Sequence, residues 1–198
     1  MKLSIISSSL REDSQSKRIA NILKDTIIKL SNNCDIFTVD LINENCPYWS
    51  SNKKENDFYK NKWINISKNF QNSDGFILVV PEYGGMASPL SKNLFLMCDN
   101  GEFFHKPGLI VSISSGNGGA YPISELRSSS YKNSHIMWIP ENIIIRNVEQ
   151  FSPGNHGDLI PKWIDNRIEY ACNLLINYAE CLKPIQKKIN RKDFANGM

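Results

Sequence analysis

The sequence lacks the features that mark several common classes of protein. Its five cysteines are an odd number with no CxxC pair, which argues against both a disulfide framework and a zinc ribbon. The formal net charge of +3 is too small to indicate a nucleic-acid or membrane-surface partner. No apolar run approaches the roughly 18 residues that a membrane-spanning helix needs. We therefore expect a reduced, cytoplasmic chain with no membrane partner and no nucleic-acid partner.

Metal and nucleotide signatures are missing as well. The three histidines, at positions 105, 135 and 156, have no metal-ligand spacing, so we expect no metal site. There is no GxxxxGK[ST] loop for a nucleoside triphosphate and no GxGxxG for a dinucleotide. The first residues, Lys2–Ser7, are typical of an apolar strand rather than of a targeting segment.

Short apolar runs alternate with helical patterns along the chain. Between the runs, apolar residues recur at three-to-four spacing, which predicts amphipathic helices. Such alternation is typical of an α/β fold in three layers, with a five-stranded parallel sheet in the order 2-1-3-4-5 and helices on both faces. The predicted strands are Lys2–Ser7, Cys34–Leu41, Phe76–Val80, Leu109–Ile113 and His135–Ile139.

The length of 198 residues fits one domain with a sizeable core. We place this domain at residues 1–182. The last helix is expected to open at Pro161 and to end near Leu182, where its apolar stripe stops. Residues 183–198 then form a basic, loosely held tail. The stretch Ile143–Phe151 is compatible with either an edge strand or a loop.

Three loops are expected to meet at one edge of the sheet. In open parallel sheets, ligands bind at the carboxyl ends of the strands, where the winding direction switches. Strands one, three and four are neighbours in the predicted order. The loops that follow them, at residues 7–16, 81–89 and 114–119, should therefore converge on one site.

The first loop is rich in hydroxyl groups and carries one cation. Ser9, Ser14 and Ser16 offer neutral hydrogen-bond donors and Arg11 adds a guanidinium, all at the start of a predicted helix. A helix N-terminus supplies free backbone N–H groups and a positive dipole end, both of which favour a phosphate. The loop therefore predicts a site for a terminal monophosphate. A solvated turn with a serine N-cap is the alternative.

The second loop follows the third strand, which we expect to end at Pro81 because proline cannot donate to a sheet ladder. Gly84 and Gly85 would let the main chain approach a flat ligand closely, and Tyr83 would supply one wall. Glu82 is interpreted as an exposed carboxylate, held for its backbone rather than as an acid or base. The alternative is an ordinary Pro/Gly loop before a serine-capped helix.

The third loop, SSGNGG, is dense in glycine. Ser115 would donate a hydrogen bond, while Gly116, Gly118 and Gly119 would allow close approach to the other side of a planar ring. One glycine cluster is a weak signal. Three such loops at neighbouring strand ends favour a ligand that has both a phosphate and a planar ring.

Together these motifs resemble those of the NADPH-dependent FMN reductases, which have a flavodoxin-like fold. Members typically open with a strand and GSxRxxSxN, matched here by residues 8–16, and carry PEYN after the third strand, matched by residues 81–84. A Ser/Gly-rich loop after the fourth strand is matched by residues 115–119, and the resemblance covers roughly residues 1–180. The sequence departs from these motifs at three positions: Ser8 replaces glycine, Ser16 replaces asparagine and Gly84 replaces asparagine. Ser8 and Ser16 would keep hydrogen-bond donors near the phosphate.

The resemblance implies an FMN-dependent NAD(P)H oxidoreductase. It would pass hydride from NADPH (or NADH) through bound FMN to a quinone, a free flavin or a similar small-molecule electron acceptor, with no protein group as catalytic acid or base. It also implies a homodimer or homotetramer. The implied FMN-binding residues are Ser9, Arg11, Ser14, Gln15, Ser16, Pro81, Glu82, Tyr83, Gly84, Gly85, Ser115, Gly116, Gly118 and Gly119.

Two interpretations of other classes remain open. One is a non-enzymatic flavodoxin-like electron carrier, although such carriers tend to be strongly acidic and this chain has a charge of +3. The other is a flavin-binding regulatory module whose basic tail meets a partner. A frayed terminus is the simpler explanation of that tail.

Overall fold

The structure, a computed structural model, describes residues 1–193, 196 and 197. Short helical turns η1 (Lys53–Glu55), η2 (Tyr59–Trp63) and η3 (Val148–Gln150) accompany the main elements. In chain order, those elements are β1 (Lys2–Ser7), α1 (Gln15–Leu30), β2 (Asp35–Asp40), α2 (Ile64–Gln71), β3 (Gly75–Tyr83), β4 (Met86–Ala87), α3 (Pro89–Met97), β5 (Pro107–Ile113), α4 (Ala120–Ser129), β6 (Met137–Ile145), β7 (Phe151–Ser152), β8 (Asn155–His156) and α5 (Ile164–Lys188).

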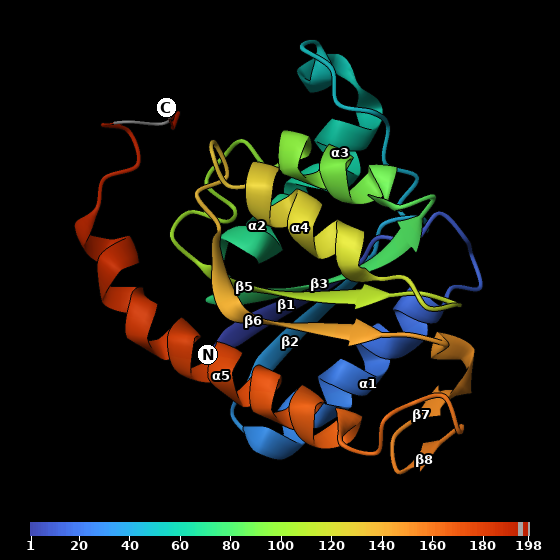
Figure 1. Cartoon of the computed structure of the whole chain (residues 1–198). Helices are drawn as coiled ribbons and strands as arrows, with labels where there is room; N and C mark the ends of the chain where they lie inside the picture. The colour runs from blue at the N-terminus through green and yellow to red at the C-terminus, as the bar shows by residue number, and fades with distance from the viewer. Residues whose placement is uncertain (194–195, 198) are drawn as a thin grey trace.

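The central sheet has five parallel strands in the order β2-β1-β3-β5-β6. This order confirms the predicted 2-1-3-4-5 arrangement. Helices α1 and α5 cover one face of the sheet and α2, α3 and α4 cover the other, so the three layers are confirmed as well (Figure 1). Two short pairs were not predicted, namely β4 against β3 and the separate hairpin β7–β8.

Two apolar clusters hold the layers together. Neighbouring strand residues belong to opposite clusters, because successive side chains of a strand point to opposite faces. Ile5 of β1 packs in the cluster under α1 and α5, and Ile6 packs in the cluster under α2, α3 and α4. Strands buried on both faces read as continuous apolar runs, which is why the sequence revealed them.

Strand β3 is longer than the sequence predicted. It continues through Pro81, which lies opposite Ile113 of β5, to Tyr83. The expected end at Pro81 is therefore wrong. A proline loses only its N–H, and its fixed φ is compatible with an extended backbone. The residues after it stay extended because Glu82 and Tyr83 pair with β4.

Strand β6 begins later and ends later than predicted. It starts at Met137, because His135 has a left-handed φ of 55° that no strand residue adopts. It then runs through Pro140 to Ile145, so the ambiguous stretch opens as an edge strand. An edge strand is the position in a sheet where proline is tolerated.

Helix α5 continues past Leu182 to Lys188 and contains Pro184. The predicted end of the domain therefore falls inside a helix. Proline removes one helical hydrogen bond, but residues on both sides of it contact the loops that precede β3 and β5. Gln186 Nε2 donates to the His105 carbonyl at 3.4 Å. Lys183 Nζ lies 3.1 Å from Asp74 Oδ2, beside the start of β3.

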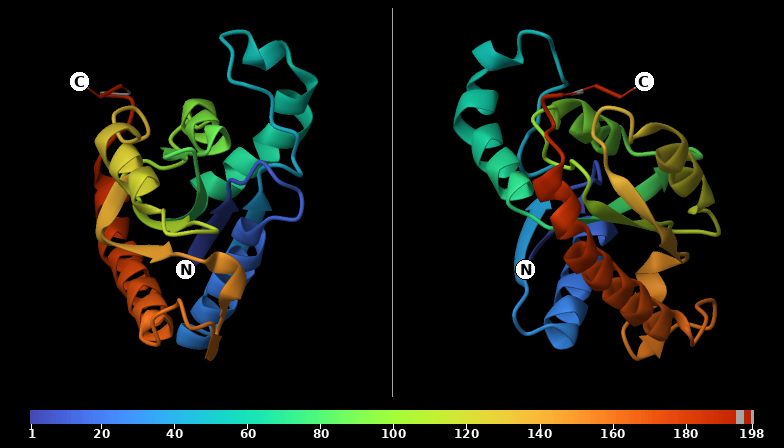
Figure 2. Two further views of the ribbon diagram at one scale, coloured as in Figure 1. Left: turned by 45° about the vertical axis from the view of Figure 1, so that its right-hand side comes forward. Right: turned by 90° about the vertical axis from the view of Figure 1, so that its left-hand side faces the viewer.

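The views in Figure 2 show the segment between β2 and α2 standing out from the body of the fold. No helix among the described residues has the length and apolar character needed to cross a bilayer.

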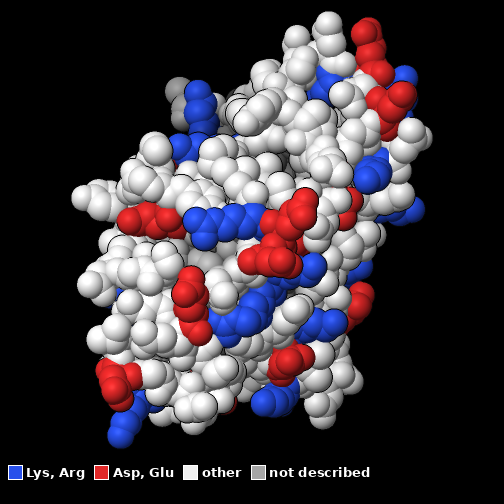
Figure 3. Space-filling model, turned by 90° about the vertical axis from the view of Figure 1, so that its right-hand side faces the viewer, with Lys and Arg blue, Asp and Glu red and all other residues white. Residues whose placement is uncertain are grey.

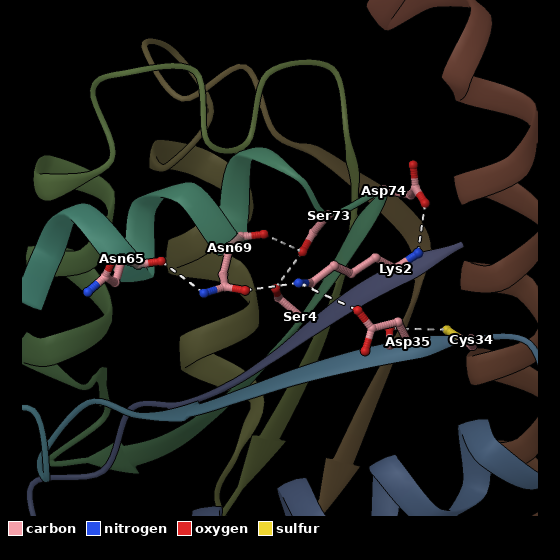
Figure 4. Close-up of polar contacts among 8 residues, drawn as sticks. All are labelled: Lys2, Ser4, Cys34, Asp35, Asn65, Asn69, Ser73 and Asp74. Carbon is pink, nitrogen blue, oxygen red and sulfur yellow. Dashed lines mark hydrogen bonds and ion pairs between the residues drawn. The ribbon is translucent and has the colours of Figure 1, made fainter.

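Polar side chains bind one another at the amino edge of the sheet. The backbone N–H of Lys2 donates to Asp74 Oδ2 at 2.8 Å, and Lys2 Nζ donates to Asn69 Oδ1 at 2.9 Å. The hydroxyls of Ser4 and Ser73 share a buried hydrogen bond of 2.6 Å. These contacts join β1 to the end of α2 and the start of β3 (Figure 4).

A buried lysine adds to the same edge. Lys106, 5% exposed, precedes β5 and donates from Nζ to the carbonyls of Phe70 at 2.8 Å and Gln71 at 2.7 Å. Burial lowers the pKa of Lys106 to about 8, although the charges of Asp74 and Glu102 act in the opposite direction. The lysine therefore supplies donors to carbonyls at the end of α2.

Candidate functional site

The carboxyl ends of β1, β3 and β5 meet around a cavity of about 150 Å³. The three loops therefore converge, as the sequence predicted. The lining also includes Asp13, Ile113 at the end of β5, Ser114 of the third loop, and Val148 and Glu149 of turn η3. The predicted residues that line it are Ser9, Arg11, Ser14, Gln15, Ser16, Pro81, Glu82, Tyr83 and Ser115.

The N-terminus of α1 forms the polar floor of the cavity. Ser14 is the N-cap, and its Oγ accepts a hydrogen bond from the backbone N–H of Lys17 at 3.2 Å. The serine cap of the alternative interpretation is thus present, and it leaves the hydroxyl hydrogen of Ser14 able to donate. Ser16 is 1% exposed, and its Oγ has no hydrogen-bond partner among the described residues.

Tyr83 connects the first loop to the end of β3. Its hydroxyl shares a hydrogen bond of 2.9 Å with Ser9 Oγ and accepts one from the backbone N–H of Leu10 at 3.3 Å. The guanidinium of Arg11 lies 5.9 Å from the centroid of the Tyr83 ring, within cation–π range. Arg11 is exposed, so its charged end remains accessible to a ligand in the cavity.

Glu82 has a different role from the one predicted. Its Oε2 accepts hydrogen bonds from the backbone N–H groups of Gly119 at 2.7 Å and Tyr121 at 3.3 Å. These groups belong to the N-cap and first turn of α4. The carboxylate is therefore half-buried and caps a helix, rather than standing exposed on a loop.

The five predicted glycines do not line the cavity. Gly84 and Gly85, with φ of 58° and 75°, form the two-residue turn between β3 and β4, and this left-handed backbone is by itself enough to require glycine there. A side chain at Gly118 would meet Glu82 Oε1 at 2.4 Å, and Gly119 has a φ of 106°. Gly116 faces open space.

The departures from the family pattern can now be explained structurally. Ser8 is fully buried and lies outside the cavity lining; its hydroxyl donates to the Val79 carbonyl at 3.0 Å and accepts from Ser88 Oγ at 3.1 Å. The expectation that Ser8 keeps a donor near the phosphate is therefore wrong. Ser16 does line the cavity. Gly84 replaces asparagine, the other residue that tolerates a left-handed φ.

Turn η3 was missed by the sequence analysis. Val148 and Glu149 bring it to the cavity, and Arg18 of α1 holds it there. The guanidinium of Arg18 donates to the carbonyls of Val148 at 2.5 Å and Phe151 at 2.6 Å. The only signal in the sequence was the ambiguous stretch in which η3 lies.

The start of α3 is anchored away from the cavity. Ser88 caps it, so the serine cap of the alternative interpretation of the second loop is present. Lys92 forms an ion pair with Glu125, which also accepts from the backbone N–H of Ala87 at 2.7 Å. Burial would raise the pKa of Glu125, but the hydrogen bonds from Lys92 and Ala87 and the Lys92 charge lower it overall. Lys92 therefore anchors helix α3 to Glu125 of α4.

Charges of both signs lie on this face. Figure 3 looks onto the side of the molecule toward which the strands β5 and β6 point, where basic and acidic side chains are interspersed. Around the cavity itself, Arg11 is joined by the carboxylates of Asp13, Glu82 and Glu149. The attraction for an anion is therefore local, confined to Arg11 and the N-terminus of α1.

A second hollow, of about 410 Å³, adjoins the cavity and shares Arg11 and Tyr83 with it. Unlike the cavity, it is almost wholly apolar. Its edges include Leu10 and Met86, which are 46% and 54% exposed. The arrangement thus sets a polar, phosphate-sized space beside an apolar surface.

Comparison with known proteins gives one family match. The sequence model described as NADPH-dependent FMN reductase matches residues 1–150, about three quarters of the chain. None of the curated protein sequences matches this chain.

Solved structures show the same fold at low sequence identity. An oxidoreductase from Corynebacterium diphtheriae superposes with a TM-score of 0.71 at 16% identity, covering 91% of this chain and 96% of that one. FerB, a flavoenzyme NAD(P)H:(acceptor) oxidoreductase from Paracoccus denitrificans, gives 0.68 at 16% identity over 91% and 98%. An NADH:FMN oxidoreductase, EMOB, gives 0.67 at 14% identity over 92% and 90%.

Proposed function

The chain belongs to the NADPH-dependent FMN reductase family, and from this membership we propose which of its residues hold the flavin and which acceptor it serves. It is an oxidoreductase that uses FMN, with NAD(P)H as electron donor. Membership favours the enzyme over the two alternatives, an electron carrier and a regulatory module.

The phosphate of FMN is proposed to bind at the N-terminus of α1. The observation that carries this proposal is the buried hydroxyl of Ser16, which has no partner in the described part of the chain and lines the cavity beside Arg11. A buried hydroxyl without a partner is costly, and a phosphate oxygen would accept its hydrogen bond. The cavity of about 150 Å³ is far larger than the space that one water molecule needs, so it has room for a phosphate group.

Ser9, Ser14 and Gln15 of the same loop are proposed to meet the phosphate as well, and the predicted residues of the second and third loops are proposed to contact the flavin ring. Tyr83 and the 81–85 segment would meet one side, and the 115–119 loop would meet the other. When bound, FMN supplies the hydride transfer between NAD(P)H and the acceptor. The protein would bind and orient the flavin. Glu82 keeps the 115–119 loop fixed by accepting hydrogen bonds from the N–H groups of Gly119 and Tyr121.

The acceptor is proposed to be a quinone or a similar flat, weakly charged molecule. The apolar hollow beside Tyr83 supports this proposal, because apolar surface gains free energy on leaving water only when it meets an apolar partner. A small inorganic oxyanion would gain nothing from such a surface. Quinones are thus favoured over charged acceptors.

We propose a homodimer or homotetramer as the working assembly. The exposed Leu10 and Met86 at the rim of the hollow support a contact there with a second copy of the chain. Sedimentation of the purified protein at several concentrations tests this proposal. A strictly monomeric protein would overturn it.

The experiment for the function measures NADPH oxidation with a quinone acceptor, together with the flavin released on denaturation. We expect a yellow protein that releases FMN and turns over with a quinone. Met86→Glu should raise the KM for the quinone with little change in the KM for NADPH. Met137→Glu changes a methionine of similar exposure, 42%, outside the hollow, and serves as its control. A protein that binds no FMN after reconstitution would contradict the proposal.

A further inference from the structure

Arg18 and Gln15 form a hydrogen-bonded pair on the first turns of α1. The guanidinium Nε of Arg18 donates to Gln15 Oε1 at 2.6 Å. Its two terminal nitrogens donate to the carbonyls of Phe151 and Val148. All three guanidinium nitrogens are therefore committed to fixed acceptors, and one of these is a side chain that lines the cavity.

The chemistry of the pair orients the glutamine. A guanidinium has only donors, whereas a primary amide carries one acceptor oxygen and one donor NH2 group. Gln15 can therefore face Arg18 only with its oxygen. The NH2 group has no partner among the described residues and is the end left for a ligand in the cavity that Gln15 lines.

We propose that Arg18 is a positioning residue that makes Gln15 a dedicated hydrogen-bond donor to the phosphate of the ligand. The inference rests on the proposed function, because it takes the ligand of the cavity to be FMN. It adds a source of selectivity: without Arg18, the amide can turn its oxygen toward the phosphate, and an acceptor facing an anion repels it.

The contacts of Arg18 with the chain around turn η3 also position groups at the edge of the cavity. They fix the Val148 and Phe151 carbonyls, and the turn between them carries Glu149 at the edge of the cavity. Arg18 thereby orders two walls that lie 130 residues apart in the sequence. Its own positive charge would also attract a phosphate, so the test must separate charge from orientation.

A double-mutant cycle makes that separation. Flavin-free wild type, Arg18→Met, Gln15→Leu and the double variant are titrated with FMN and with riboflavin, which lacks the phosphate. Each single change should weaken FMN about tenfold, the loss of roughly one hydrogen bond to a charged group, and riboflavin less than about twofold. The double variant should lose little more than either single variant, because both changes remove the same interaction.

Arg127→Met is the matched control. Arg127 is also a half-buried arginine on a helix, and it donates to the carbonyls of Ile139 at 2.6 Å and Glu141 at 3.2 Å, outside the cavity. Its replacement should lower the melting temperature to a degree comparable with Arg18→Met. The FMN affinity should stay within about twofold of wild type.

Gln15→Glu covers the case in which Arg18→Met fails to fold. The carboxylate keeps an acceptor for Arg18, so the fold is retained, but it offers no donor to the cavity. FMN should bind more than about tenfold more weakly, and riboflavin should bind as before.

Three results would overturn the inference. Equal losses for FMN and riboflavin would make Arg18 a merely structural residue. Additive losses in the cycle would assign its effect to charge alone, and wild-type FMN affinity in Gln15→Glu would remove the glutamine from the site. The proposed function fails separately, through a wild-type protein that binds neither flavin.

Discussion

The two ends of the sheet differ in how many of their buried polar groups have hydrogen-bond partners. At the amino end, Asp74 accepts a hydrogen bond from the backbone N–H of Lys2 and forms an ion pair with Lys183. The ammonium groups of Lys2 and Lys106 donate to acceptors of α2. At the carboxyl end, buried polar atoms lack partners among the described residues. These atoms are Ser7 Oγ, Ser16 Oγ, Asp40 Oδ1 and Ser112 Oγ. Elsewhere in the described residues, Trp63 Nε1 and His135 Nε2 also lack a partner, and His135 lies at the amino end, just before β6.

This difference distinguishes polar groups that stabilise the fold from groups that await a ligand. Most buried polar atoms in proteins have a hydrogen-bond partner, so a cluster of exceptions needs an explanation. Four of the exceptions, Ser7, Ser16, Asp40 and Ser112, lie at the sheet edge where ligands bind in α/β folds. We therefore expect changes in the amino-end network to alter stability without altering flavin binding, and changes at Arg11 and Ser16 at the carboxyl end to alter flavin binding with little effect on stability.

The largest effect is expected from Arg11→Ala at the carboxyl end. It removes a charge-assisted interaction with the phosphate, so FMN affinity should fall roughly ten- to a hundredfold. Riboflavin affinity and the melting temperature of the flavin-free protein should hardly change. Flavin titrations of this variant are compared with Lys17→Ala, an exposed cation on α1 outside the cavity lining. Equal losses for both flavins would break the comparison between the two ends.

Lys106→Met tests the amino end. The Gln71 carbonyl would lose its hydrogen bond and the Phe70 carbonyl would lose one, while relief of the buried charge offsets part of the cost. The free energy of unfolding should fall by about 2 kcal/mol in urea. FMN affinity, measured on the folded protein, should not move. A large loss of affinity would show that the two ends are coupled.

The pH dependence of stability gives a smaller effect at the same lysine. Because its folded pKa of about 8 lies below the value of about 10.5 in the unfolded chain, the folded state releases its proton first. The penalty for burying the charge is full below pH 8 and disappears as the pH rises toward 10.5. As the pH rises from 8 to 9, the free energy of unfolding of the wild type should therefore increase by about 1 kcal/mol relative to that of Lys106→Met. Parallel stability curves for the two proteins would contradict this.

Ser16→Ala is expected to have the smallest effect. Its hydroxyl has no hydrogen-bond partner among the described residues, so the flavin-free protein should keep its stability. FMN should bind roughly fivefold more weakly. Ser4→Ala is the matched change at the amino end. It breaks the 2.6 Å bond to Ser73 and should cost about 1 kcal/mol of stability with no change in FMN affinity. A reversed pattern would refute the distinction drawn between the ends.

Local signals in the sequence were enough for the sheet and for the place of the site. Apolar runs such as Phe76–Val80 mark strands buried on both faces, and the order of strands places their loops together. Serines at a helix start and a nearby arginine predict an anion site by their own chemistry. These features depend only on neighbours in the chain.

Contacts between distant residues were not predictable in this way. Glu82 meets Gly119 across 37 residues, and Arg18 meets Val148 across 130. Neither pairing follows from composition or period, because it depends on the register of the strands and the path of the loops. The same holds for Pro81, whose neighbours keep it in a strand that propensity alone would end there.

The cap that Glu82 places on α4 gives the binding face a direction. Two helix N-termini, those of α1 and α4, adjoin the predicted loops, and either would attract an anion by its dipole. The α4 end already holds a carboxylate, so a phosphate approaching it would meet a like charge. A molecule with one anionic end and one neutral, flat end can therefore lie across this face in a single orientation, with its charge at α1.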